Sequence, residues 1–123
     1  MNKQKLILHI CPRKGWLEAL DEGNYRAPSL EIEGFIHCSR SDQLLEVANS
    51  IYRDIPDLLL LWIDPKKVNA DIKYEQGSER TNQRYPHIYG PLNLDAVLAI
   101  SDFAPGTDGV FQEVPEFVRY RNI

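Results

Sequence analysis

The chain has 123 residues, 43% of them hydrophobic, which suits one domain with an ordinary core. The chain has 14 Lys and Arg and 18 Asp and Glu, which gives a formal net charge of −4. This charge excludes general attraction to nucleic acid or to an anionic membrane. The two cysteines lack the spacing of a zinc site, no stretch has the pattern of a secretory signal, and no apolar run is long enough to span a membrane. The sequence therefore predicts a single domain over residues 1–123, reduced thiols and a cytoplasmic location.

The first elements in chain order are a strand and a helix. Residues 6–11 form an apolar run that predicts a strand, and Pro12 ends it because proline has no N–H to donate. Apolar residues then recur at helical spacing between Arg13 and Glu22, and Gly23 follows in the position of a left-handed helix cap.

A loop, a second strand and a second helix come next. Residues 24–28 predict the loop, and residues 30–34 lead into a strand over residues 35–38. Ser39 or Ser41 would cap a helix that runs from Leu44 to a stop near Pro56.

The rest of the chain predicts four strands, separated by Pro, Gly, Asn and Asp: residues 58–63, 71–75, 87–90 and 96–103. The polar residues 76–84 predict a mobile loop, and the tail from residue 106 to residue 123 is not assigned. Two main helices early and strands late predict an α+β fold with mostly antiparallel sheets.

All three histidines, His9, His37 and His87, fall in predicted strands. Alternation places Phe35, His37 and Ser39 on one face of their strand. Buried polar groups need partners, so several of them in strand interiors favour a polar cleft, although a single buried His9 would more often be a satisfied core histidine.

The chain resembles the small bacterial proteins of domain of unknown function 952. The matching pieces span residues 9–92, which is most of the chain. The resemblance rests on His9, Trp16, Gly23-x-Tyr25, Ser29-Leu30, the run Glu33-Gly34-Phe35-Ile36-His37-Cys38-Ser39, Gln43, and the run Pro86-His87-Ile88-Tyr89-Gly90-Pro91-Leu92.

This resemblance implies an ADP-ribosyltransferase-like fold, in which NAD lies in a cleft between two small sheets. The run at residues 35–39 is similar to the His-Val-His-Leu-Ser run of RNA 2′-phosphotransferases, which matches His37 and Ser39 to ligand-holding positions and His9 to the first-strand histidine. Ile10 and Cys11 depart from the Gly-Thr that follows that histidine. For the transferase glutamate, Glu75 or the run at residues 87–89 is available.

The resemblance therefore implies NAD as a substrate, and the predicted site has two parts. The catalytic residues are His9, His37 and Glu75. The NAD-binding residues are His9, Tyr25, Arg26, His37, Ser39, His87 and Tyr89. The rings of His9 and His37 are expected to face one cleft, with Tyr25 stacking on a flat ring of the ligand and Arg26 near phosphate.

Three functions fit these residues. The first is an NAD-dependent ADP-ribosyl or phosphoryl-acceptor transferase with an unspecified acceptor and no metal. The alternative is a protein of the same fold that binds a nucleotide or a phosphorylated metabolite without chemistry. The third, a protein–protein module, is favoured only by the polar residues 76–84 and the apolar tail.

Overall fold

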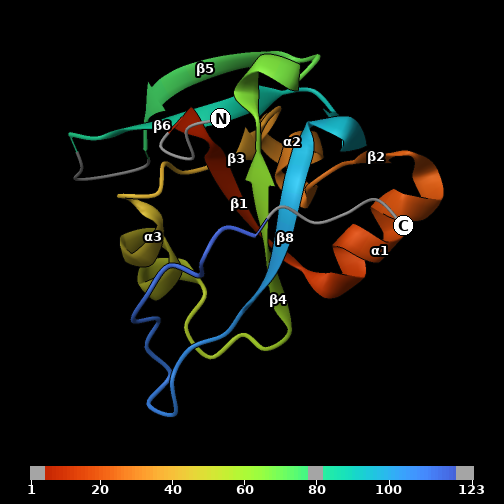
Figure 1. Cartoon of the computed structure of the whole chain (residues 1–123). Coiled ribbons are helices and arrows are strands. Elements are labelled where there is room, and N and C mark those ends of the chain that lie inside the picture. The colour runs from red at the N-terminus through yellow and green to blue at the C-terminus, as the bar shows by residue number, and fades with distance from the viewer. Residues whose placement is uncertain (1–4, 78–81, 119–123) are drawn as a thin grey trace.

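The computed structural model describes residues 5–77 and 82–118 and has an α+β fold in which every paired strand is antiparallel (Figure 1). The described elements are β1 (Ile7–Pro12), α1 (Arg13–Glu22), β2 (Asn24–Tyr25), α2 (Pro28–Glu33), β3 (Ile36–His37), α3 (Leu44–Ile51), β4 (Leu58–Ile63), β5 (Asp71–Gln76), β6 (Arg84–Tyr89), β7 (Leu92–Asn93) and β8 (Val97–Phe103). No helix among these residues is long and apolar enough to cross a membrane.

The first sheet has the order β1–β4–β8 and is buried on both faces. Alternate residues of β4 enter two separate cores: Leu59 and Leu61 pack with Trp16 of α1, whereas Leu58 and Leu60 pack with Leu44 of α3. Every residue of β4 is buried. This double burial explains why the strand is a continuous apolar run and not an alternating one.

The second sheet has the order β3–β6–β5, and its strands β5 and β6 run across one end of the first sheet (Figure 1). A two-stranded pair, β2 with β7, completes the fold. The two larger sheets meet where Leu8 of β1 and Ser39 exchange both main-chain hydrogen bonds, each 2.8 Å long. The edge strand of one sheet is thus joined to the edge strand of the other beside the histidines.

Most predicted elements are confirmed, and three predictions are wrong. Residues 28–33 form a third α-helix, α2, and do not lead directly into a strand, because the chain turns back at Gly34 with a left-handed φ of 93°. Residues 24–25 are a short strand and not part of a loop. Helix α3 begins after Gln43, and neither Ser39 nor Ser41 caps it, because the N-cap position is Gln43 and has no side-chain cap hydrogen bond.

The segment predicted as a mobile loop and the unassigned tail are only partly described. Residues 76–77 and 82–84 lie at the ends of β5 and β6, and residues 78–81 of the predicted loop lie outside the described part. In the tail, Phe111 and Phe117 pack against the second core. Residues 119–123 also lie outside the described part.

Candidate functional site

His9 lies in the middle of β1 with its ring buried, only 6% exposed. Its Nδ1 lies 2.5 Å from the main-chain oxygen of His37, and its Nε2 lies 2.8 Å from the hydroxyl of Tyr25. Because a carbonyl oxygen only accepts, Nδ1 carries the proton, and the lone pair of Nε2 accepts from the Tyr25 hydroxyl. Both ring nitrogens of His9 are therefore occupied within the protein.

Burial sets the protonation states around His9. It lowers the pKa of His9 to about 4, raises the pKa of Cys11 to about 12, and raises the pKa of Tyr25 well above its ordinary value. At neutral pH all three groups are uncharged. This arrangement differs from the expected cleft, since the ring of His9 faces a core and Tyr25 is not an open stacking surface.

His37 lies on β3 with its side chain 52% exposed. Its Nε2 lies 2.7 Å from a carboxylate oxygen of Glu33, the last residue of α2. The left-handed turn at Gly34 brings these two residues together. The ring of Phe35 meets the ring of His37 edge-on, with 4.8 Å between centroids, so Phe35 and His37 share a face as predicted.

A second carboxylate holds His87. Glu75 of β5 accepts at one oxygen, Oε1, from Nδ1 of His87 at 2.8 Å and from the hydroxyl of Tyr89 at 2.5 Å. The hydrogen bonds from Tyr89 and then His87 lower the pKa of Glu75, and the bond to Glu75 raises the pKa of Tyr89. Glu75 is therefore an ionised carboxylate held by two donors.

The antiparallel register brings the two glutamate–histidine pairs onto one face of the sheet. His37 lies opposite His87 in the β3–β6 pairing, and their ring centroids are 5.4 Å apart at an interplanar angle of 77°. Phe35 stacks on His87 at 4.1 Å. We call this surface the histidine face, and it consists of Glu33, Phe35, His37, Glu75, His87 and Tyr89. Lys73, opposite His87 on β5, adds a cation 4.8 Å from the centre of the Tyr89 ring.

Four side-chain polar atoms of the histidine face make no hydrogen bond to another described residue: Oε1 of Glu33, Nδ1 of His37, Oε2 of Glu75 and Nε2 of His87. An imidazole nitrogen and a carboxylate oxygen can bind sugar hydroxyls or exchange protons. Within residues 5–77 and 82–118, no group of three or more His, Cys, Asp or Glu is arranged to hold a metal ion.

Two other predicted binding residues make no hydrogen bond or ring contact with the described residues of this face. Ser39 is buried, and its main chain pairs with Leu8. Because β3 is only two residues long, the alternation that would place Ser39 beside His37 does not extend that far. Arg26 is exposed, directly after β2.

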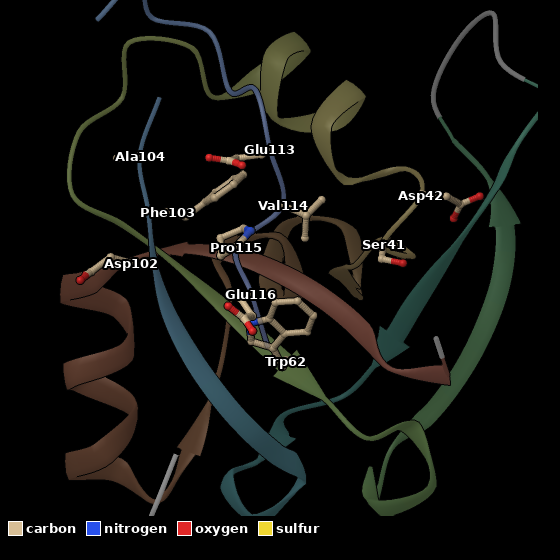
Figure 2. A pocket seen from close by; sticks show the side chains of 10 residues that line it. All are labelled: Ser41, Asp42, Trp62, Asp102, Phe103, Ala104, Glu113, Val114, Pro115 and Glu116. Atoms are coloured by element: carbon tan, nitrogen blue, oxygen red, sulfur yellow. The ribbon is translucent and has the colours of Figure 1, made fainter. Parts of the chain in front are cut away.

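A cavity of about 960 Å³ lies elsewhere, between the tail and the first sheet (Figure 2). Four carboxylates line it, together with Trp62 and five further residues: Asp42, Asp102, Glu113 and Glu116 are the acids, and Ser41, Phe103, Ala104, Val114 and Pro115 are the others. Two of these acids already pair with Arg40 and Arg13. The negative lining disfavours a phosphate-bearing ligand, so the histidine face is the better candidate for a nucleotide.

The predicted site residues did not include Glu33 and Lys73, and Phe35 was expected only to share a strand face with His37. The spacing of Glu33 and His37 by four residues is a signal only if α2 and its turn are recognised. The place of Lys73 depends on the register of β5 against β6, which a single sequence does not specify.

The fold and the site define a small α+β domain with two joined antiparallel sheets and a pair of glutamate-bound histidines on one of them. A sequence profile of the family described as "Protein of unknown function (DUF952)" matches residues 10–100, so the chain belongs to that family. This match confirms the predicted resemblance to domain of unknown function 952.

Solved structures of a related protein are similar in fold to this chain. The crystal structure of protein CC0527 from Caulobacter crescentus has 31% sequence identity and a TM-score of 0.78, covering 87% of this chain and 93% of that one. Its solution NMR structure has 32% identity and a TM-score of 0.75, covering 88% and 92%. A search of curated proteins gave no match.

Proposed function

We propose that the chain binds NAD, or a nucleotide that contains ADP-ribose, at the histidine face and transfers the ADP-ribosyl group to an acceptor with release of nicotinamide. The observation that carries the proposal is Glu75, an ionised carboxylate fixed by His87 and Tyr89 with its Oε2 free. A fixed carboxylate suits a reaction in which positive charge develops on the ribose ring.

The other groups of the face suit the same ligand. A neutral imidazole can accept from a ribose hydroxyl, and His37 is exposed enough to do so. The rings of Phe35 and Tyr89 offer apolar surface for a flat base. Lys73 supplies a positive charge for a phosphate.

His9 acts in this proposal as a positioning residue. It cannot reach a ligand while both ring nitrogens are bonded, but its Nδ1–H holds the main-chain oxygen of His37. The hydrogen bond fixes the strand from which the His37 ring projects. The join between the two sheets at Leu8 and Ser39 supports an ADP-ribosyltransferase-like split of the fold, which is also part of the proposal.

A second candidate is a protein that binds a nucleotide or phosphorylated metabolite without chemistry. The burial of His9 and the presence of Ile10 and Cys11 after it favour this candidate, because no bare backbone is offered to nicotinamide there. The two candidates share the histidine face and differ in whether Glu75 acts on a bond.

Glu75→Gln separates the two candidates. We expect this substitution to abolish nicotinamide release while NAD affinity stays within about tenfold, because a contact made only in the transition state need not stabilise the ground state. His37→Ala should weaken NAD binding itself. Calorimetry measures the affinity, and chromatography measures nicotinamide.

Glu46→Gln is the matched control, since Glu46 is exposed on α3, away from the histidine face. This variant should keep both binding and release. If the wild-type protein binds NAD but releases no nicotinamide with any acceptor, the binding protein is the correct candidate. If the wild-type protein binds no NAD, the proposal fails.

A further inference from the structure

We infer that Nε2 of His87 is the general base that takes the proton of the acceptor, which is a hydroxyl compound or water. The inference rests on the proposed function, because it names a proton-transfer group for that same site. Its geometric basis is the 2.8 Å hydrogen bond between Nδ1 of His87 and Oε1 of Glu75.

This hydrogen bond selects one tautomer of His87. An ionised carboxylate can only accept, so the neutral ring carries its proton on Nδ1 and keeps a lone pair on Nε2. The hydroxyl of Tyr89 donates to the same carboxylate oxygen and holds it in place. A carboxylate that orients an imidazole and stabilises its protonated form is the arrangement that makes histidine an effective base.

The surroundings of His87 leave Nε2 usable. Phe35 covers one side of the ring and His37 meets it edge-on, so the residue is only 5% exposed. Among the described residues, Oδ1 of Asn24 is the one side-chain polar atom that is both fully buried and without a partner. Nε2 of His87 has no protein partner there and so remains in contact with solvent.

Few charged groups face this ring. From β3 comes His37, which is itself bonded to Glu33, and from β5 come Lys73 and Glu75. Tyr89 on β6 lies on the same face and bonds Glu75, and Tyr85 on β6 is paired opposite Glu75. Of these groups, Glu75 alone bonds the His87 ring directly and can stabilise a proton arriving on it.

The proposed step transfers one ADP-ribosyl group and one proton. The acceptor oxygen forms a bond to C1′ of the ribose, and the bond between C1′ and the nicotinamide nitrogen breaks. Nicotinamide leaves as a neutral molecule with the electron pair of that bond. The proton of the acceptor hydroxyl moves to Nε2 of His87, and the resulting imidazolium is stabilised by Glu75 until solvent takes the proton.

The first test is the tautomer of His87 in the free protein. Long-range proton–nitrogen NMR of the ¹⁵N-labelled chain at pH 8 should show the proton of His87 on Nδ1. Glu75→Ala should mix the tautomers, whereas Tyr89→Phe, which keeps the carboxylate, should retain the wild-type form. A wild-type ring protonated on Nε2 would overturn the inference regardless of any activity.

The second test is chemical rescue. His87→Ala should lower kcat for nicotinamide release by about 10² to 10⁴, with the KM for NAD within about tenfold, and added imidazole should restore turnover. A structural role for His87 would give no such rescue. His87→Gln, which keeps a polar side chain of similar size, provides a second inactive variant if His87→Ala does not fold.

The outcomes separate the two proposals. If the wild-type chain does not bind NAD in calorimetry, the proposed function and this inference fall together. If the wild-type chain binds and cleaves NAD, and folded His87→Ala or His87→Gln cleaves it at the wild-type rate, the inference alone is overturned. Loss of turnover in folded His87→Ala without rescue by imidazole also overturns the inference.

Discussion

His9 and His87 show how the surroundings give one residue type different uses. Both are buried and both lie in strands, but both nitrogens of His9 are bonded within the protein, whereas Nε2 of His87 is free of protein partners among the described residues. Burial lowers the pKa of His9 in the folded chain below that of a free imidazole. This difference in pKa makes the free energy of unfolding depend on pH.

The expected dependence follows from the two pKa values. The unfolded imidazole titrates near 6.5, whereas folded His9 titrates near 4. Between these values the unfolded chain binds more protons, so the free energy of unfolding falls as pH decreases from 6.5 to 4, by up to about 3 kcal/mol. This contribution is fully present above pH 6.5. Urea unfolding at several pH values measures it.

His9→Gln is the variant for this prediction, because an amide can still donate and accept but does not titrate. Between pH 4 and 6.5, the free energy of unfolding of this variant should depend less on pH than that of the wild-type chain, because the titration of His9 no longer contributes. His37→Gln is the control, since it leaves His9 in place and should keep that contribution. An unchanged pH dependence in His9→Gln would show that other groups cause it.

The local sequence predicted much of the candidate site at the level of single residues. The runs around His37 and His87 identified the two histidines, and Glu75 was named as one available match to the glutamate that the resemblance implies. The burial of His9 could not be predicted, because it depends on Tyr25 reaching it from another element. Long-range partners of this kind are absent from a local pattern.

At the scale of elements, α2 and its turn are the part that the sequence did not reveal. Leu30 and Ile32 are two residues apart, which is typical of a strand, and Ile32 is 81% exposed in the structure. The helix therefore lacks a buried apolar stripe. Pro28 at its start and Gly34 after its end are the signals that remain.

Gly34→Ala tests the importance of this turn. The φ of Gly34 is 93°, and a side chain there has open space but an unfavourable backbone, so we expect a loss of about 1–2 kcal/mol in stability. A shift of the turn also moves Glu33 relative to His37 and should weaken NAD binding. Thermal unfolding and calorimetry measure the two effects.

Gly23→Ala is the matched control for that substitution. Gly23 ends α1 with a φ of 88° and also has open space around it, so its loss of stability should be similar. It lies outside the histidine face, and NAD binding should be unchanged. Equal effects of the two substitutions on binding would remove the link between the turn and the site.

At the scale of the whole molecule, the strands and the α+β class could be predicted, but the arrangement of the sheets could not. The apolar run of β4 indicated a buried strand, and the structure places this strand at the centre of the first sheet. The bridge between Leu8 and Ser39 joins the two sheets through non-local contacts. Pairings of this kind depend on register, which the sequence alone leaves open.

The central claim is that a nucleotide binds at the histidine face and not in the acidic cavity. Titration of the ¹⁵N-labelled chain with NAD and with ADP-ribose tests this claim most directly, because each amide signal reports on its own surroundings. We expect saturable shifts at Phe35, His37, Glu75, His87 and Tyr89. Shifts confined to the cavity around Asp102 and Glu113, or no shifts at millimolar ligand, would contradict the claim.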